Sequence, residues 1–325
     1  MTTIPATTQT KQTANSARRA LTVIGDRWTL LILRDAFLGV HQFGVWQTRL
    51  GVAPAVLTRR LKSLTENGIL RRQRLKTVPP RIEYHLTKQG FDIHSIALMV
   101  LQWEQRWFKA PRGSAIVLRH LGCGQITEPR LTCGSCGAET SAREVRYESG
   151  PGAGAENINE KRMRRASITA ADNRATHGFL EHAVDILGDR WGWEIVGAAF
   201  LGHKRFDDLQ ASTGMATNIL SDRLRRLSAD GILTRHPYQQ NPLRYEYVLT
   251  AKGRDLFPAI VMLVRWGDRW LANAAGVPML LFHKTCGGSL NPAVSCSSCG
   301  GTLDPHEMSY EFSDGSVGKA LPRAG

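Results

Sequence analysis

Ile24-Gly25-Asp26-Arg27-Trp28 occurs a second time in this chain, as Leu187-Gly188-Asp189-Arg190-Trp191. The offset from Gly25 to Gly188 is 163 residues. The same offset relates Phe37-Leu38-Gly39 to Phe200-Leu201-Gly202, and Gly68-Ile69-Leu70 to Gly231-Ile232-Leu233. An unbroken offset indicates two copies of one fold, with no net insertion between these landmarks. The second copy therefore serves as an internal alignment, in which agreement marks the fold or a metal site and disagreement is free to carry specificity.

Length and charge limit the class of protein. A chain of 325 residues suits two domains, and the period is far too long for a solenoid. The formal net charge of +14 and the pI of about 9.9 favour a polyanionic partner, nucleic acid first and an anionic membrane surface second. The alternative is that the charge only keeps the protein soluble.

The chain is expected to be cytoplasmic, with no membrane association. Residues 1–20 lack the apolar run of a signal peptide, and the apolar stretches near 96–101 and 258–264 are short and flanked by charge. In that compartment, six cysteines favour metal ligation over disulfides.

Each copy gives the same pattern of elements. Apolar residues at helical spacing surround Gly25-Asp26, which predicts that Gly ends one helix and Asp caps the next. For Asp26 and its counterpart Asp189, we prefer this capping role to a catalytic one. Further helices are predicted from about residues 42 and 205, and then over 54–66 and its counterpart. Two strands around a Pro-containing loop follow, and then a long helix capped by Thr87 or Thr250. This order predicts a mainly helical α+β fold with two tandem winged helix-turn-helix domains.

The matching motifs resemble the HxlR-type winged helix-turn-helix transcriptional regulators. In copy one they are Ile24-Gly25-Asp26-Arg27-Trp28-Thr29-Leu30-Leu31-Ile32-Leu33-Arg34, Leu57-Thr58-Arg59-Arg60-Leu61-Lys62-Ser63-Leu64, Glu66-Asn67-Gly68-Ile69-Leu70 and Glu83-Tyr84-His85-Leu86-Thr87-Lys88-Gln89-Gly90. The resemblance implies transcriptional control through double-stranded DNA, with dimerisation through the first and last helices. Some relatives sense oxidants through a cysteine beside the first helix, and this chain has none there.

The predicted recognition helices differ between the copies. The second helix of such a motif enters the major groove, so its outward residues are the candidates for base contact. These are Ala55, Thr58, Arg59 and Lys62 in copy one and Asn218, Ser221, Asp222 and Arg225 in copy two, with Arg81 and Arg244 at the hairpin tips. A carboxylate at Asp222, in place of Arg59, opposes phosphate but could accept a hydrogen bond from cytosine. The two modules are therefore expected to read different sequences. Arg60 and Arg223 agree between copies, which indicates a fold-supporting or phosphate-contacting role.

All six cysteines fall into two matched sets, each with the spacing His-x2-Cys, nine residues, Cys-x2-Cys. Copy one supplies His120, Cys123, Cys133 and Cys136, and copy two supplies His283, Cys286, Cys296 and Cys299. Three thiolates and one imidazole suit tetrahedral Zn²⁺, and a closed set of four ligands is structural. We therefore predict two structural Zn²⁺ sites, one in a small ribbon at the end of each copy. Neither an open metal position nor paired acids near the cysteines is apparent, so a zinc enzyme is not expected.

The chain is thus predicted to divide into seven segments. They are a disordered arm at 1–17, winged domains at 18–110 and 176–273, zinc ribbons at 111–149 and 274–312, a flexible basic linker at 150–175 and a tail at 313–325. The two copies are expected to pair within one chain as a pseudo-dimer, placing two recognition helices about 34–36 Å apart on DNA; a homodimer is the alternative.

Other roles stay open. Six of the eight tryptophans are repeat-matched, which favours core and interface packing over a cage for a small-molecule effector; Trp46 and Trp193 are unmatched. The alternatives to a simple regulator are a redox or metal sensor acting through the ribbon cysteines, and a zinc-ribbon interaction factor of the transcription machinery.

Overall fold

The computed structural model describes residues 10–78, 80–109, 115–158, 180–312 and 317–318. The helices of the first repeat are α1 (Ser16–Ile24), α2 (Arg27–Phe37), α3 (Phe43–Leu50), α4 (Pro54–Glu66), α5 (Lys88–Phe91) and α6 (His94–Trp107). Those of the second are α7 (Glu181–Leu187), α8 (Arg190–Phe200), α9 (Phe206–Thr213), α10 (Thr217–Ala229), α11 (Ala251–Arg254) and α12 (Phe257–Trp270), with the short 3-10 helix η1 (Pro305–Glu307). Within these residues, no helix has the length and apolar character needed to cross a membrane.

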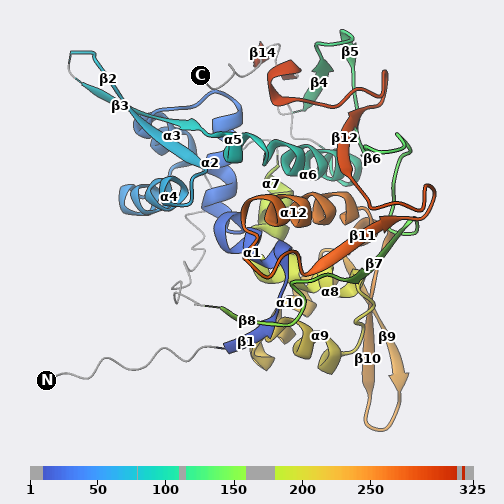
Figure 1. Cartoon of the computed structure of the whole chain (residues 1–325). Helices are drawn as coiled ribbons and strands as arrows, with labels where there is room; N and C mark the ends of the chain where they lie inside the picture. Colours follow the sequence, from blue (N-terminus) through green and yellow to red (C-terminus); the bar gives the residue numbers. More distant parts are fainter. Residues whose placement is uncertain (1–9, 79, 110–114, 159–179, 313–316, 319–325) are drawn as a thin grey trace, which may run out of the picture.

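Short strands complete both repeats. In the first half they are β1 (Thr10–Thr13), β2 (Leu70–Leu75), β3 (Arg81–Leu86), β4 (Ile116–His120), β5 (Gln125–Ile126), β6 (Pro129–Cys133), β7 (Val145–Ser149) and β8 (Ala155–Ile158). In the second half they are β9 (Leu233–Gln239), β10 (Arg244–Leu249), β11 (Met279–His283), β12 (Pro292–Cys296), β13 (Met308–Phe312) and β14 (Val317–Gly318). The winged helix-turn-helix order is therefore present twice. The β2–β3 and β9–β10 hairpins form the wings, which project at opposite ends of the molecule in Figure 1.

Local sequence sets the helix ends. The Asp26 carboxylate accepts a hydrogen bond from the Thr29 backbone N–H at the start of α2, and Asp189 accepts one from Trp191 at the start of α8. Thr87 caps α5 in the same way. The long helix predicted after Thr87 is two helices, because α5 ends at Phe91 and α6 begins at His94. The prediction of a single helix there is wrong.

The predicted terminal and linker segments are partly ordered. β1 pairs antiparallel with β8, so the arm predicted as disordered over 1–17 is a strand from Thr10 and a helix from Ser16. β8 likewise lies in the predicted flexible linker. Residues 1–9, 159–175 and most of the predicted tail lie outside the described part of the chain.

The two repeats pack around a pseudo-twofold axis. Asp26 and Asp189, which are equivalent in the repeats, face each other in an isolated antiparallel bridge. Leu131 of β6 and Val294 of β12, also equivalent, are direct partners in an antiparallel pair. Equivalent residues can be mutual partners only on the axis, so it passes through both points. In this structure the two repeats of one chain pair with each other.

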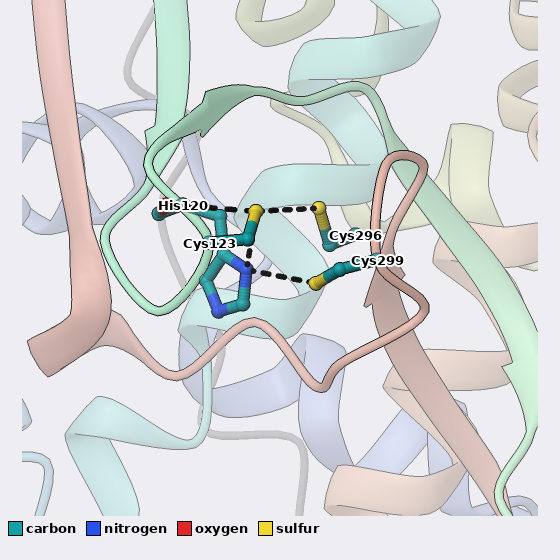
Figure 2. A group of neighbouring side chains, drawn as sticks. All are labelled: His120, Cys123, Cys296 and Cys299. Carbon is teal, nitrogen blue, oxygen red and sulfur yellow. Dashed lines mark hydrogen bonds between the residues drawn. The ribbon is translucent and has the colours of Figure 1, made fainter.

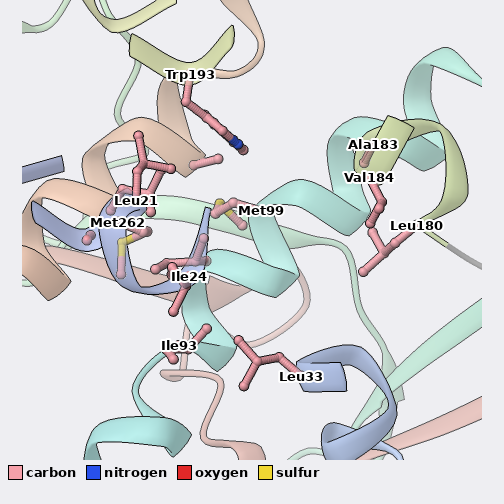
Figure 3. Packing of buried hydrophobic residues seen from close by; sticks show 14 of the residues in the cluster. Leu21, Ile24, Leu33, Ile93, Met99, Leu180, Ala183, Val184, Trp193 and Met262 are labelled. Carbon is pink, nitrogen blue, oxygen red and sulfur yellow. The ribbon is translucent and has the colours of Figure 1, made fainter. Parts of the chain in front are cut away.

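First helices are exchanged across this axis. α1 of the first repeat packs on α12 of the second, and α7 of the second packs on α6 of the first. In Figure 3, Leu21 and Ile24 of α1 lie among Met99 of α6 and Met262 of α12 within one continuous buried core. Each repeat thus completes the other's hydrophobic core.

Repeat-matched tryptophans join the two halves by reciprocal hydrogen bonds. The Trp103 indole N–H donates to the Lys252 carbonyl at 2.8 Å, and the Trp266 indole N–H donates to the Gln89 carbonyl at 3.0 Å. Trp107 donates in the same way to the Asp255 carboxylate and Trp270 to Asp92. The prediction that these tryptophans serve core and interface packing is confirmed for the two pairs on α6 and α12.

The strands after the winged domains pair between repeats, which corrects the prediction of one ribbon per repeat. β4 pairs with β13, β11 pairs with β7, and β6 pairs with β12. Each of these three ladders joins a strand of the first repeat to one of the second. Within the described residues, the Cys-rich extensions therefore form three small sheets, each with strands from both repeats, in place of two separate modules.

Candidate nucleic-acid interface and metal-binding clusters

The first recognition helix, α4, has the predicted sidedness. Leu57, Leu61 and Leu64 are buried. The predicted base-contacting residues Ala55, Thr58, Arg59 and Lys62 are all exposed on the opposite face. Lys62 lies 3.8 Å from the Glu66 carboxylate, but both side chains are largely exposed, so this pair restrains it little. The geometry leaves the basic groups of α4 available to a partner.

The second recognition helix, α10, has the same sidedness and a different charge arrangement. Asn218, Ser221 and Arg225 are exposed. Asp222 is half-buried, and its carboxylate pairs with Arg223 and Arg225 at 2.7 Å and with Arg226 at 3.0 Å. The Asp222 carboxylate therefore forms ion pairs with three guanidinium groups, and these pairs restrain the arginines as well as Asp222.

These contacts change the ionisation of Asp222. Partial burial alone would raise the pKa of its carboxyl group, but the hydrogen bond from Arg225 and the charges of Arg226 and Arg223 outweigh burial and lower that pKa. The group stays ionised at neutral pH. Its oxygens accept from arginines, which differs from the predicted role of accepting from a cytosine edge.

Arg60 and Arg223 lie beside the helix caps. Arg60 pairs with Asp26 at 3.1 Å, and Arg223 pairs with Asp189. Since both carboxylates cap the helix that precedes the motif, these arginines tie the recognition helix to that helix. The fold-supporting half of the prediction for this pair is confirmed.

The wings carry more positive charge than the prediction identified. Arg81 and Arg244 are exposed at the ends of β3 and β10, as expected for hairpin tips. On β2, Arg71, Arg72 and Arg74 are also exposed. On the second wing, Arg235 lies over the Tyr245 ring, with its guanidinium carbon 4.7 Å from the ring centroid. The run Arg71-Arg72, in the first strand of the hairpin, was the sequence signal for this additional basic surface.

The eight predicted metal ligands form two clusters, but each cluster draws on both repeats. His120 and Cys123 lie with Cys296 and Cys299 (Figure 2). Cys133 and Cys136 lie with His283 and Cys286. In each cluster the four candidate ligand atoms lie within 4.8 Å of one another. The structure brings all eight residues into two clusters of four, but the predicted grouping within one repeat is wrong, because the strands that carry these residues pair across the pseudo-twofold axis.

Three separations in the first cluster lie close to the edge lengths expected for four ligands around Zn²⁺. With Zn–S near 2.3 Å and Zn–N near 2.05 Å, tetrahedral edges are about 3.8 Å between sulfurs and about 3.6 Å between sulfur and nitrogen. The Cys123 and Cys296 sulfurs are 3.9 Å apart, and His120 Nδ1 lies 3.5 Å from Cys123 and 3.3 Å from Cys299. In the second cluster, His283 Nδ1 lies 3.3 Å from the Cys136 sulfur and 3.5 Å from the Cys286 sulfur.

Backbone contacts favour the thiolate at one position of each cluster. Burial alone would raise the pKa of Cys133, but backbone groups of Ser135, Asn291 and Cys136 outweigh it and lower that pKa to about 6. Burial would also raise the pKa of Cys296, but a hydrogen bond from the Thr127 side chain and backbone groups of Cys299 and Ser298 outweigh it and lower that pKa to about 6. Partly deprotonated sulfurs suit cation binding.

Comparison with known proteins places this architecture in a family. The profile of the HxlR-like helix-turn-helix family matches residues 23–112 and, separately, residues 186–275, which together exceed half of the chain. The chain belongs to the HxlR-like helix-turn-helix family. The double match shows that the HxlR-like unit is duplicated in tandem.

Individual relatives match parts of this chain. Rv3095 of Mycobacterium tuberculosis, an uncharacterised HTH-type transcriptional regulator, is 44% identical over 137 residues, which are 42% of this chain and 87% of the relative. YvaP of Bacillus subtilis, described in the same words, is 36% identical over 93 residues, 28% of this chain and 86% of the relative. Among solved structures, the redox regulator HypR in its reduced form is 33% identical and covers 28% of this chain and 90% of its own, with a TM-score of 0.27.

This HxlR-like chain also contains an apolar cavity between its repeats. The cavity measures about 60 Å³ and is lined by apolar side chains that include Leu33, Ile93, Val184 and Trp193 (Figure 3). An engineered cavity of about 150 Å³ in another protein binds benzene. A second pocket in this chain, lined by residues that include Phe200, Phe257 and Val264, measures about 120 Å³. The predicted small-molecule effector stays a prediction.

Proposed function

We propose that this HxlR-like regulator binds an operator with two unequal half-sites, one read by α4 and the other by α10. The observation that carries this is the difference at equivalent positions: Arg59 is exposed on α4, whereas Asp222 on α10 is half-buried and paired with arginines. An exposed arginine on a recognition helix is suited to guanine O6 and N7. On α10 the exposed Asn218 is instead suited to adenine N6 and N7.

The wings also differ between the two repeats in the number of exposed arginines. Four arginines of the first wing are exposed: Arg71, Arg72, Arg74 and Arg81. On the second wing two arginines are exposed, Arg235 and Arg244, and Arg235 lies over the Tyr245 ring. Since phosphate contacts supply most of the salt-dependent affinity, the first half of the chain is expected to contribute more of it.

One chain supplies both recognition helices in this proposal. The reciprocal tryptophan contacts and the exchanged first helices support a monomer that acts as a pseudo-dimer. Half-sites would then be separated by about one DNA turn, 34–36 Å. A chain that is dimeric in solution, or one that binds a single half-site, would overturn this arrangement.

A selection of binding sites from random duplex DNA tests the proposal. The expected result is a bipartite site whose halves differ, with guanine favoured at the base facing Arg59 and not at the equivalent base of the other half. The variant Ala55→Asn with Arg59→Asp gives α4 the α10 residues at two positions, and should shift the selected site toward symmetry. The matched control Ala229→Glu copies Glu66 into α10 without altering either position. A perfect palindrome selected by the unaltered protein would contradict the proposal.

A second candidate, control of DNA binding by metal or oxidant at the cysteines, has one supporting observation. Both Cys/His clusters join the two repeats, so a change at the sulfurs would act on the placement of the repeats. Peroxide or chelator treatment followed by a DNA-binding assay separates the two candidates. Reversible loss of DNA binding with intact winged domains would favour sensing. A footprinting experiment that shows no sequence preference would instead favour a third role, that of an interaction factor of the transcription machinery.

A further inference from the structure

We infer that the chain binds two Zn²⁺ ions, each shared between the repeats, so that the metals fasten one half of the molecule to the other. The first site takes ligands from His120 and Cys123 and from Cys296 and Cys299. The second takes ligands from Cys133, Cys136, His283 and Cys286. Metal binding of this kind is independent of the proposed DNA-binding role, because it is measured without DNA.

Each ligand pair lies on a tight turn that is already formed. The backbone N–H of Gly124 donates to the His120 carbonyl at 2.8 Å, and that of Gly137 donates to the Cys133 carbonyl at 2.7 Å. The counterparts Gly287 and Gly300 donate to His283 and Cys296 at 2.8 and 2.9 Å. All four glycines have φ between 71° and 74°, where a side chain would be strained. Four such turns, each presenting two ligands, are typical of two closed tetrahedral sites.

The donor set favours zinc over a disulfide. A disulfide would use two sulfurs and leave a thiol and an imidazole beside it without a role. In the first cluster, His120 Nδ1 approaches both Cys123 and Cys299 at tetrahedral-edge distances, which places the imidazole within the ligand set. Three sulfurs and one nitrogen in a tetrahedron suit Zn²⁺, and no position remains open for water or substrate.

An additional contact supports the ligand atom at the second site. The Thr140 hydroxyl lies 3.3 Å from His283 Nε2, so this nitrogen has a partner while Nδ1 faces the sulfurs. A hydrogen bond at the outer nitrogen is how proteins commonly orient a metal-bound histidine.

Strand register explains why each site is shared. β6 and β12 run antiparallel, with Cys133 opposite Pro292 and Cys296 opposite Pro129. The two Cys-x2-Cys turns therefore lie at opposite ends of this pair. Each meets a His-x2-Cys turn of the other repeat, because β4 and β11 pair with β13 and β7 across the axis. Strand pairing thus brings together ligand pairs that lie far apart in the sequence.

Two double variants of the full-length chain distinguish shared sites from sites within one repeat. Both remove two cysteines, so they differ only in the grouping of the losses. Cys123→Ser with Cys296→Ser damages one shared site and leaves the other complete. Cys123→Ser with Cys133→Ser damages both shared sites, although it would damage only one site of a single-repeat arrangement.

Zinc per chain is measured by atomic absorption after purification with zinc and dialysis against a weak chelator. We expect two zinc ions in the unaltered chain, one in Cys123→Ser/Cys296→Ser and none in Cys123→Ser/Cys133→Ser. The reverse order of the two variants would overturn the shared arrangement, and an unaltered chain without zinc would overturn the metal sites altogether.

A measurement on the unaltered protein guards against variants that fail to fold. In the cadmium-113 form, scalar couplings connect each metal with the β-protons of its own cysteines. One cadmium is expected to couple to Cys123, Cys296 and Cys299, and the other to Cys133, Cys136 and Cys286. A cadmium coupled to both Cys123 and Cys133 would refute the inference.

Discussion

Substitution of Asp222 by Asn is expected to strengthen DNA binding by the second recognition helix. In the structure the Asp222 carboxylate pairs with Arg223, Arg225 and Arg226. An amide keeps the size of the side chain but removes the negative charge. Arg225, which is exposed, would then be free to contact a phosphate.

The size of the effect follows from counterion release. Each additional neutralised phosphate steepens the dependence of log affinity on log salt by about 0.9. One added contact therefore increases the loss of affinity between 50 and 200 mM salt by about 3.5-fold. The side chains of Asp222, Arg225 and Arg226 are 31%, 76% and 59% exposed, so loss of these pairs should change the free energy of unfolding by less than about 1 kcal/mol.

The assay is a fluorescence anisotropy titration of duplex DNA at four or more salt concentrations. Glu139→Gln is the matched control, because it removes the same charge and frees Arg130, but lies outside both helix-turn-helix motifs. The control should leave the salt slope unchanged. Equal slopes for Asp222→Asn and the unaltered protein would refute the idea that Arg225 and its neighbours face DNA.

Three further predictions concern the stability of the fold. Burial lowers the pKa of His94 to about 3, whereas the unfolded chain binds the proton near pH 6.5. The stability that neutral His94 allows above pH 6.5 is therefore lost as pH falls, by about 2 kcal/mol at pH 5. In His94→Gln, the free energy of unfolding measured with urea should change less between pH 7 and pH 5 than in the unaltered protein. Trp103→Phe and Trp266→Phe should each cost about 1–2 kcal/mol in the same assay and by similar amounts, because their hydrogen bonds are equivalent; a cost confined to one of them would contradict the pseudo-symmetry. Glu194→Leu should cost about 3–5 kcal/mol, because it leaves the buried Arg18 without its carboxylate partner, and Arg18→Met in the same chain should recover most of that loss; additive costs would argue against the ion pair.

Much of the fold could be predicted because its signals are local. A Gly-Asp step between apolar helical patterns is enough to predict the caps at Asp26 and Asp189, since a capping carboxylate needs only backbone N–H groups two or three residues away. The recognition helix over 54–66 was predicted with its observed bounds because Pro starts it and Asn-Gly follows it. In contrast, the pairing of Asp222 with three arginines was missed, although the spacing to Arg225 and Arg226 is that of helical neighbours.

The sequence by itself determined the duplication, because equivalent landmarks repeat at a constant offset of 163 residues. It also determined the helix caps and the eight Cys and His residues, because each of these depends on short spacings along the chain. Only the tertiary structure decided which ligand pairs share a site. The two copies carry the same His-x2-Cys and Cys-x2-Cys turns, so a turn from either repeat is chemically equivalent as a partner for Cys123. The choice is made by strands that pair across the pseudo-twofold axis, where β6 meets β12 and sets the two Cys-x2-Cys turns apart. That pairing joins strands far apart in the chain, packed against helices α6 and α12, and no local spacing encodes it.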